Sequence, residues 1–195
     1  MPKTQSALLQ AMEEGLISID GTPYTLPKPF FVIGTQNPHE EVGTFPLPTS
    51  QLDRFMSSFG IGYPDRSSER EILKGETGHS AAVSKTLLTS EQIESYMKQA
   101  SMVTLSETLL DFLQDIIAYT RESGQFEYGL STRGALALTA MTKSWAMMQG
   151  RSYATADDLQ TVTSVVCVHR LQFTEGNTTA KRIHDEIFTH VRSDT

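Results

Sequence analysis

The stretch Phe30-Phe31-Val32-Ile33-Gly34-Thr35-Gln36-Asn37-Pro38 decides the fold class of this chain. A short run of apolar residues is typical of a strand that is buried on both faces of a sheet. We predict this strand over residues 30–35, with the uncharged amide of Asn37 at its carboxyl end. Ligands of open α/β sheets bind at the carboxyl ends of the strands. The stretch therefore predicts an α/β sheet with Asn37 at a ligand site.

A second informative segment closes in Leu52-Asp53-Arg54-Phe55. The spacing of Ser50 and Asp53 is that of a capping box, which predicts a helical turn leading into Arg54. A second core strand is predicted over 55–63. A strand-end amide followed by a projecting arginine is typical of phosphate chemistry. Even so, the 195 residues contain no Gly-x-x-x-x-Gly-Lys-Ser/Thr phosphate loop.

Simpler interpretations of these residues stay open. Asn37 precedes Pro38, and Asn-Pro often initiates a turn. Arg54 can form a surface ion pair with Asp53, worth about 0–1 kcal/mol.

The rest of the chain divides into two parts. Residues 4–14 are predicted to be helical, and Asp20-Gly21 predicts a hairpin over 17–26 because this pair supplies the positive φ of a two-residue turn. After Pro64 the pattern is helical, and Thr89, Ser106, Ser131 and Thr155 stand at positions typical of N-caps. The predicted helices span 65–73, 89–100, 106–122, 131–149, 155–170 and 178–191. We therefore expect an α/β part up to about residue 64, followed by an all-helical part.

Composition excludes several classes of protein. A net charge of −7, with no local cluster of Lys and Arg, argues against a nucleic-acid partner. The apolar runs are too short to cross a membrane and no signal peptide is evident, so we expect a cytoplasmic protein without membrane insertion. The single Cys167 lies in the run Val165-Val166-Cys167-Val168, which predicts a buried thiol. The five histidines lack the spacing of ligands, so no metal site is predicted.

Several motifs in a fixed order resemble the MoxR family of AAA+ ATPases. They are Lys3-Thr4-Gln5-Ser6-Ala7-Leu8-Leu9-Gln10-Ala11-Met12-Glu13-Glu14, the hairpin, Gly34-Thr35-Gln36-Asn37-Pro38, Leu52-Asp53-Arg54-Phe55 and Gly62-Tyr63-Pro64. The resemblance covers nearly the whole chain. It implies that Asn37 is the first sensor and that Arg54 is the arginine finger, both of them catalytic.

The resemblance also implies a nucleotide-binding role for Arg133, which lies in Ser131-Thr132-Arg133-Gly134-Ala135 and corresponds to the second sensor. The family usually has proline where Thr132 stands. An arginine near a helix N-terminus meets the positive end of the helix dipole. Such a position is tolerated where an anion binds, which favours a phosphate partner for Arg133.

The resemblance implies that residues 1–64 are the C-terminal part of an AAA+ P-loop ATPase α/β core. Residues 65–195 are then an all-α helical lid domain, so the fold is helix-dominated overall. In the family, the Walker A loop and the Walker B acidic pair precede the matching segment. ATP and Mg²⁺ are therefore expected cofactors of the full-length parent. Neither is expected to bind tightly to this chain alone, and this chain alone is not expected to hydrolyse ATP.

Two functional hypotheses follow from the resemblance. In the first, the chain is the C-terminal segment of a MoxR-type ATPase that forms a homo-oligomeric ring, with a hexamer expected, and remodels client or partner proteins in a chaperone-like way. In the second, it is a non-catalytic helical protein-interaction module derived from an AAA+ scaffold.

Overall fold

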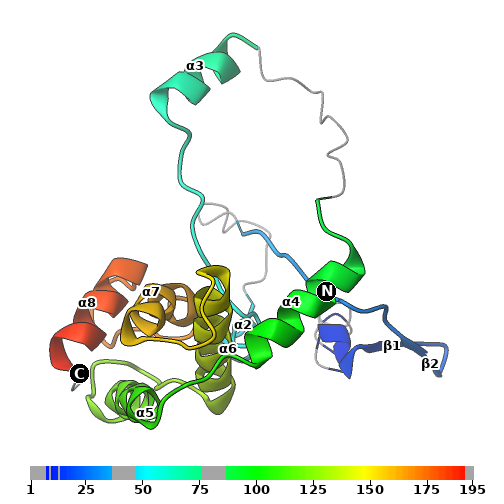
Figure 1. The fold of residues 1–195 in the computed structure, drawn as a ribbon. Coiled ribbons are helices and arrows are strands. Elements are labelled where there is room, and N and C mark those ends of the chain that lie inside the picture. Colours follow the sequence, from blue (N-terminus) through cyan, green and yellow to red (C-terminus); the bar gives the residue numbers. More distant parts are fainter. Residues whose placement is uncertain (1–7, 9, 13, 37–46, 76–86, 192–195) are drawn as a thin grey trace.

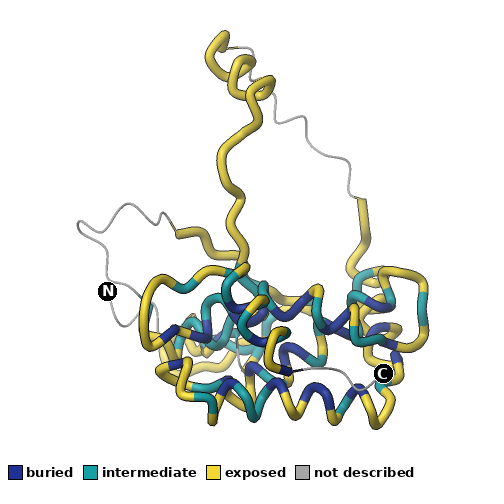
Figure 2. Tube along the Cα trace, turned by 90° about the vertical axis from the view of Figure 1, so that its left-hand side faces the viewer, coloured by how far each residue is buried: buried dark blue, intermediate teal, exposed yellow. Residues whose placement is uncertain are grey.

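The computed structural model describes residues 8, 10–12, 14–36, 47–75 and 87–191 (Figure 1). Its elements are two short strands and a larger set of helices, as the predicted helix-dominated fold requires. Helices α4 to α8 gather into one group, the strand pair lies at its side, and α3 projects away from both (Figure 1). The group of helices holds almost all of the buried side chains (Figure 2).

The predicted hairpin is confirmed. Strands β1 (Leu16–Ile19) and β2 (Thr22–Thr25) pair antiparallel, with Ile19 opposite Thr22. The two turn residues both have positive φ, 51° at Asp20 and 80° at Gly21. Positive φ at both central positions is the geometry that makes Asp-Gly the favoured two-residue turn.

The two predicted core strands are wrong. Residues 30–36 and 56–63 form no strand, and Ile33 and Ile61 are 83% and 89% exposed. A strand needs a neighbour to accept and donate its backbone hydrogen bonds. Within the described ranges, β1 and β2 form the one sheet, and neither of them pairs with these two segments.

A helical turn does precede Arg54, as predicted, but it is not closed by a capping box. Helix α2 (Thr49–Leu52) begins after Pro48, which makes no side-chain hydrogen bond to the helix. Ser50 therefore lies inside the turn, where its backbone geometry is helical. The turn ends at Asp53, whose N–H donates to Thr49 O at 2.9 Å.

Helix α3 (Arg66–Leu73) also forms where it is predicted. Asp65 caps it by accepting a hydrogen bond from Ser68 N at 2.8 Å, and Gly75 follows its end with a φ of 71°. Every residue of α3 is exposed, and the helix stands away from the remaining helices (Figures 1 and 2).

The remaining helices are α4 (Ser90–Ser101), α5 (Glu107–Glu122), α6 (Thr132–Met148), α7 (Ala156–Cys167) and α8 (Ala180–His190). The predicted N-caps of α4, α5 and α6 are confirmed, because each side chain accepts a backbone hydrogen bond from the first turn. At α7, the Thr155 N–H donates to Asp158 Oδ2 at 2.8 Å. Helix α7 stops at Cys167, before the predicted end at residue 170, and this leaves His169 and Arg170 in the turn that follows.

The hydrophobic core lies among these helices. Leu138 of α6, Val166 of α7 and Ile183 of α8 are completely buried in it. Cys167 is buried as predicted, and burial raises the pKa of its thiol to about 12. A thiol with so high a pKa stays protonated at neutral pH and packs as a small apolar group.

Candidate functional site

The segment that follows α2 is held against the helical group. Ser58 N donates to Val165 O at 2.8 Å, which fixes the segment to the last turns of α7. His169 Nε2 lies 3.0 Å from Phe55 O. Residues 53–58 are thereby attached to a part of the chain more than a hundred positions further on.

Arg170 makes most of this attachment. Its side chain is only 3% exposed, and its Nε donates to Asp53 Oδ1 at 3.0 Å. Its two terminal nitrogens donate to the carbonyl oxygens of Asp53 at 3.1 Å and Met56 at 3.2 Å, and also to those of Phe55 and Val166. A guanidinium carries five donors in one rigid plane, which suits it to hold a turn of backbone in this way.

The carboxylate of Asp53 faces the first turn of α6. It accepts a hydrogen bond from Ser131 Oγ, which lies 3.0 Å and 2.9 Å from its two oxygens, and Ser131 Oγ in turn accepts from Gly134 N at 2.9 Å. Arg133 Nη1 lies 3.7 Å from Asp53 Oδ2. A negative charge at this place is stabilised by the positive end of the helix dipole.

The structure places two of the three site residues predicted from the sequence. Asn37 lies outside the described residues. Arg54 is partly buried at the end of the turn that Arg170 holds, and Arg133 is 44% exposed beside Asp53. The structure thus brings the segment of Arg54 and the helix turn of Arg133 together around Asp53. We call the contacts of Asp53 with Ser131, Arg133 and Arg170 the Asp53 joint. An anion was expected near Arg133, and the Asp53 carboxylate is that anion in the structure. The positive end of the helix dipole is therefore compensated by Asp53 without a phosphate.

Arg170 is the residue that sequence reasoning missed. A signal for it exists, because Arg170 follows the apolar run Val165-Val166-Cys167-Val168 after a single histidine. A charged residue so close to a buried run is rarely buried unless it is paired. The sequence nevertheless gives no indication of which carboxylate pairs with it.

Gly134 permits the close approach of Arg170 to α6. A Cβ built on Gly134 would lie 2.6 Å from Leu130 Cδ1 and 3.0 Å from Arg170 Cδ. These separations are below ordinary van der Waals contact, so a larger residue here would displace one of the two side chains.

His169 is a neutral donor in this joint. Burial lowers its pKa, with a further lowering by the Arg170 charge, while the hydrogen bond to Phe55 O and the Asp53 charge oppose the shift. Its Nδ1 is buried without a hydrogen-bond partner. A buried Nδ1 without a partner costs less free energy when it is unprotonated than when it carries the N–H of a charged ring. The neutral ring therefore has its proton on Nε2, which donates a hydrogen bond to Phe55 O.

The lowered pKa of His169 predicts a pH dependence of stability. The unfolded chain takes up a proton at His169 as the pH falls through its ordinary pKa of 6.5, whereas the folded chain resists this uptake. The stabilisation is therefore complete above pH 6.5 and declines as the pH falls below it. Titration of the His169 ring by NMR checks the shift directly. The unfolding free energy of His169→Gln, which keeps an N–H donor, should depend less on pH between 5 and 6.5 than that of the wild type. A His169 pKa at or above 6.5 contradicts the prediction.

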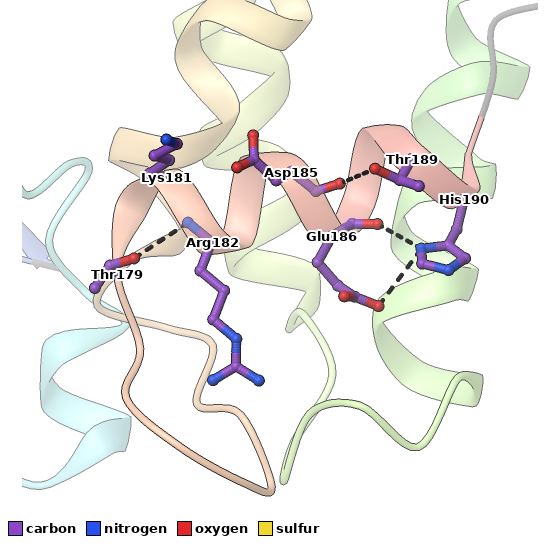
Figure 3. A pocket seen from close by; sticks show the side chains of 7 residues that line it. All are labelled: Thr179, Lys181, Arg182, Asp185, Glu186, Thr189 and His190. Carbon is purple, nitrogen blue, oxygen red and sulfur yellow. Dashed lines mark hydrogen bonds and ion pairs between the residues drawn. The ribbon is translucent and has the colours of Figure 1, made fainter.

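A separate concave surface lies along α8 (Figure 3), lined by Thr179, Lys181, Arg182, Asp185, Glu186, Thr189 and His190. Its polar groups bond one another along the same helix. Thr189 Oγ1 lies 2.6 Å from Asp185 O, and His190 Nδ1 lies 2.8 Å from Glu186 O (Figure 3). This surface is formed by one helix and its entry turn, and it does not include the Asp53 joint.

Comparison with known proteins agrees with this architecture. The model of the ATPase family associated with various cellular activities (AAA) matches residues 1–57, and that of the AAA lid domain matches residues 118–187. The chain is 34% identical over 181 residues to chaperone MoxR1 of Mycobacterium tuberculosis, an alignment that covers 88% of this chain and 48% of that protein. The chain belongs to the MoxR family of AAA+ ATPases.

A second curated protein and a solved structure are also similar to this chain. Protein YeaC of Bacillus subtilis is 36% identical over 171 residues, which cover 87% of this chain and 53% of YeaC. A crystal structure from Cytophaga hutchinsonii, assigned as an ATPase, superimposes with a TM-score of 0.83 at 30% identity. It aligns with 100% of this chain and with 63% of its own. This MoxR-family chain spans about half the length of the curated relatives it matches, and it corresponds to their C-terminal portion.

The side chains of this MoxR-family chain fit one part of a nucleotide. The guanidinium of Arg133 is exposed at a helix N-terminus and offers donors of the kind that phosphate oxygens accept. In the described part of the chain, no three His, Cys, Asp or Glu side chains group as ligands for a metal ion such as Mg²⁺. No helix there combines the length and the apolar character that a bilayer crossing requires. The Arg133 guanidinium is thus a group of the kind that fits the phosphate of ATP.

Proposed function

We propose that this chain works as the C-terminal, nucleotide-responsive portion of a MoxR-type ATPase that remodels partner proteins in a chaperone-like manner. In this proposal, residues 1–64 belong to the α/β core and residues 65–195 form the helical lid. The phosphate loop and the acidic pair come from polypeptide that precedes these motifs in the family. One observation carries the proposal: a single carboxylate, that of Asp53, joins the segment of Arg54 to the helix turn of Arg133.

Each proposed site residue has a chemical role toward ATP, and hydrolysis of the phosphoanhydride bond of bound ATP would supply the free energy for remodelling. Asn37 orients a water or a γ-phosphate oxygen through its amide, without adding charge. Arg54 neutralises the charge that develops on the phosphate of a neighbouring subunit. Arg133 faces the nucleotide of its own subunit.

The contact of Arg133 with Asp53 does not prevent this role. At 3.7 Å the two groups form an ion pair that is longer than a hydrogen bond, and Arg133 is 44% exposed. Exposed ion pairs contribute only about 0–1 kcal/mol. Arg133 can therefore exchange this contact for a phosphate, while Asp53 keeps its hydrogen bonds to Ser131 and Arg170.

The remaining parts of the proposal come from the family. We place ATP between subunits of a homo-oligomeric ring in the cytoplasm, because Arg54 needs a neighbouring active site to act on. The remodelling activity is supported by the relative described as a chaperone.

Nucleotide titration tests the proposal. The 195-residue chain is expected to bind ATP at best at millimolar levels, because it has no phosphate loop. A polypeptide that joins these residues to a family phosphate loop and acidic pair should bind ATP tightly and hydrolyse it. Arg133→Ala should impair each subunit that carries it, whatever its neighbours are. Micromolar affinity and phosphate release by the 195-residue chain contradict the proposal, and hydrolysis that is insensitive to Arg133→Ala removes the sensor role.

A further inference from the structure

We propose that Arg170 is a positioning residue: it fixes the backbone turn that carries Arg54 to the helical lid, so that the arginine finger moves with α6 and α7. This inference rests on the proposed function for the role of Arg54 in hydrolysis. The fixing of the turn itself stands on contacts that the structure shows.

The contacts of Arg170 surround Arg54 on both sides. Toward the N-terminal side, Arg170 holds both the carboxylate and the backbone oxygen of Asp53. Toward the C-terminal side, it holds the backbone oxygens of Phe55 and Met56. The residue between these anchors is Arg54, so a shift of its backbone would strain or break hydrogen bonds that Arg170 makes.

The same guanidinium is itself tied to the lid. It donates to Val166 O, in the last turn of α7, and its side chain packs against the place where Gly134 lacks a Cβ. Asp53 adds a second tie, because Ser131 at the start of α6 donates to it. The turn of Arg54 is thus connected to the two helices that make the most extensive contact in the lid.

This arrangement serves position more than stability. A buried ion pair gains little net stability, because removing both charges from water offsets their attraction. The hydrogen bonds of Arg170 to the backbone on both sides of Arg54 restrict the position of Arg54. Such restriction matters for catalysis, because a misplacement of about 1 Å can lower the rate by about 10²-fold. A lid that rotates on nucleotide exchange would carry Arg54 with it.

The test compares Arg170→Met with a matched control in the same lid. Arg151 pairs with Asp158 at the start of α7 through two hydrogen bonds of 2.6 Å and 2.5 Å, and the Asp158 side chain is 3% exposed. Arg151→Met therefore removes a partly buried pair whose side-chain hydrogen bonds stay within residues 151–158. Both variants are measured by thermal unfolding, by hydrogen exchange of the 195-residue chain, and by ATP hydrolysis in the longer polypeptide described above.

Arg170→Met is expected to speed hydrogen exchange at Ser58 and its neighbours, and to lower kcat by about 10²-fold with little change in the KM for ATP. Arg151→Met is expected to lower the melting temperature without either effect. Arg170→Lys guards against a failure to fold, because lysine keeps the charge pair with Asp53 and lacks the planar fork. This variant should stay folded, show faster exchange over residues 53–58, and lose part of kcat.

Three results overturn the inference. The first is exchange over residues 53–58 that is unchanged in both Arg170 variants. The second is equal loss of kcat in Arg151→Met and Arg170→Met at equal loss of stability, which makes Arg170 structural only. The third is full kcat in Arg170→Lys together with wild-type exchange. Failure of the proposed function has a different signature: Arg54→Ala then keeps full hydrolysis, while the exchange data still report on the turn.

Discussion

Replacing Arg54 by alanine is expected to lower the rate of ATP hydrolysis by about 10³–10⁵-fold in the assembled ATPase, the range known for arginine fingers. In the proposed role, the guanidinium neutralises charge that is greater in the transition state than in bound ATP, so its loss should lower kcat and largely spare nucleotide affinity. Phosphate release and a nucleotide-binding titration, measured on the same preparation, separate the two effects. A variant that binds ATP poorly and hydrolyses what it binds at a normal rate contradicts the assignment.

A mixing experiment decides whether Arg54 acts on its own subunit or on a neighbour. Arg54→Ala subunits keep an intact active site, and subunits with an inactivated Walker B acid keep an intact finger. A mixed ring therefore contains interfaces where both are intact, and some hydrolysis should return. If mixed rings form and no activity returns, Arg54 is not a finger acting in trans. Arg54→Lys is the matched control, since it keeps the charge but loses the planar fork.

Replacing Leu138 by alanine is expected to lower the free energy of unfolding by about 2–5 kcal/mol. Leu138 is completely buried in α6, so the change removes apolar contacts and leaves a cavity that the packed helices fill only partly. Trp145, the single tryptophan, packs against the core from the same helix and reports unfolding by fluorescence in a denaturant titration.

Leu136 supplies the control for this change, because it lies on the same helix and is 66% exposed. Leu136→Ala makes the same chemical change with almost the same helix propensity, and should alter the unfolding free energy by less than about 0.5 kcal/mol. Equal effects at Leu136 and Leu138 would show that α6 does not present its buried face as the structure has it.

The predictions that held concern signals that act within a few residues. A side chain at an N-cap satisfies an N–H group in the next turn, so Thr89, Ser106 and Ser131 mark helix starts whatever lies around them. The Asp20-Gly21 turn likewise depends on the φ preferences of two residues. The end of α7 was less predictable, because the apolar run through Val168 continues past the residue where the helix stops.

The predicted strands at 30–35 and 55–63 show where such reasoning fails. The apolar run of the first and the alternation of the second indicate burial in a sheet, and a sheet exists only where other strands supply backbone partners. The hairpin is the one sheet in the described ranges, so Ile33 and Ile61 stay exposed.

The sequence by itself determined the hairpin, the helices of the lid and the family, because turn geometry, helix caps and motif order are properties of neighbouring residues. It also singled out Arg54 and Arg133, through the motifs that contain them. Only the tertiary structure decided that Asp53 pairs with Arg170, a residue 117 positions away. The charge of Arg170 is visible in the sequence, but its partner depends on which surfaces α6 and α7 bring together, and packing over the whole lid sets that arrangement.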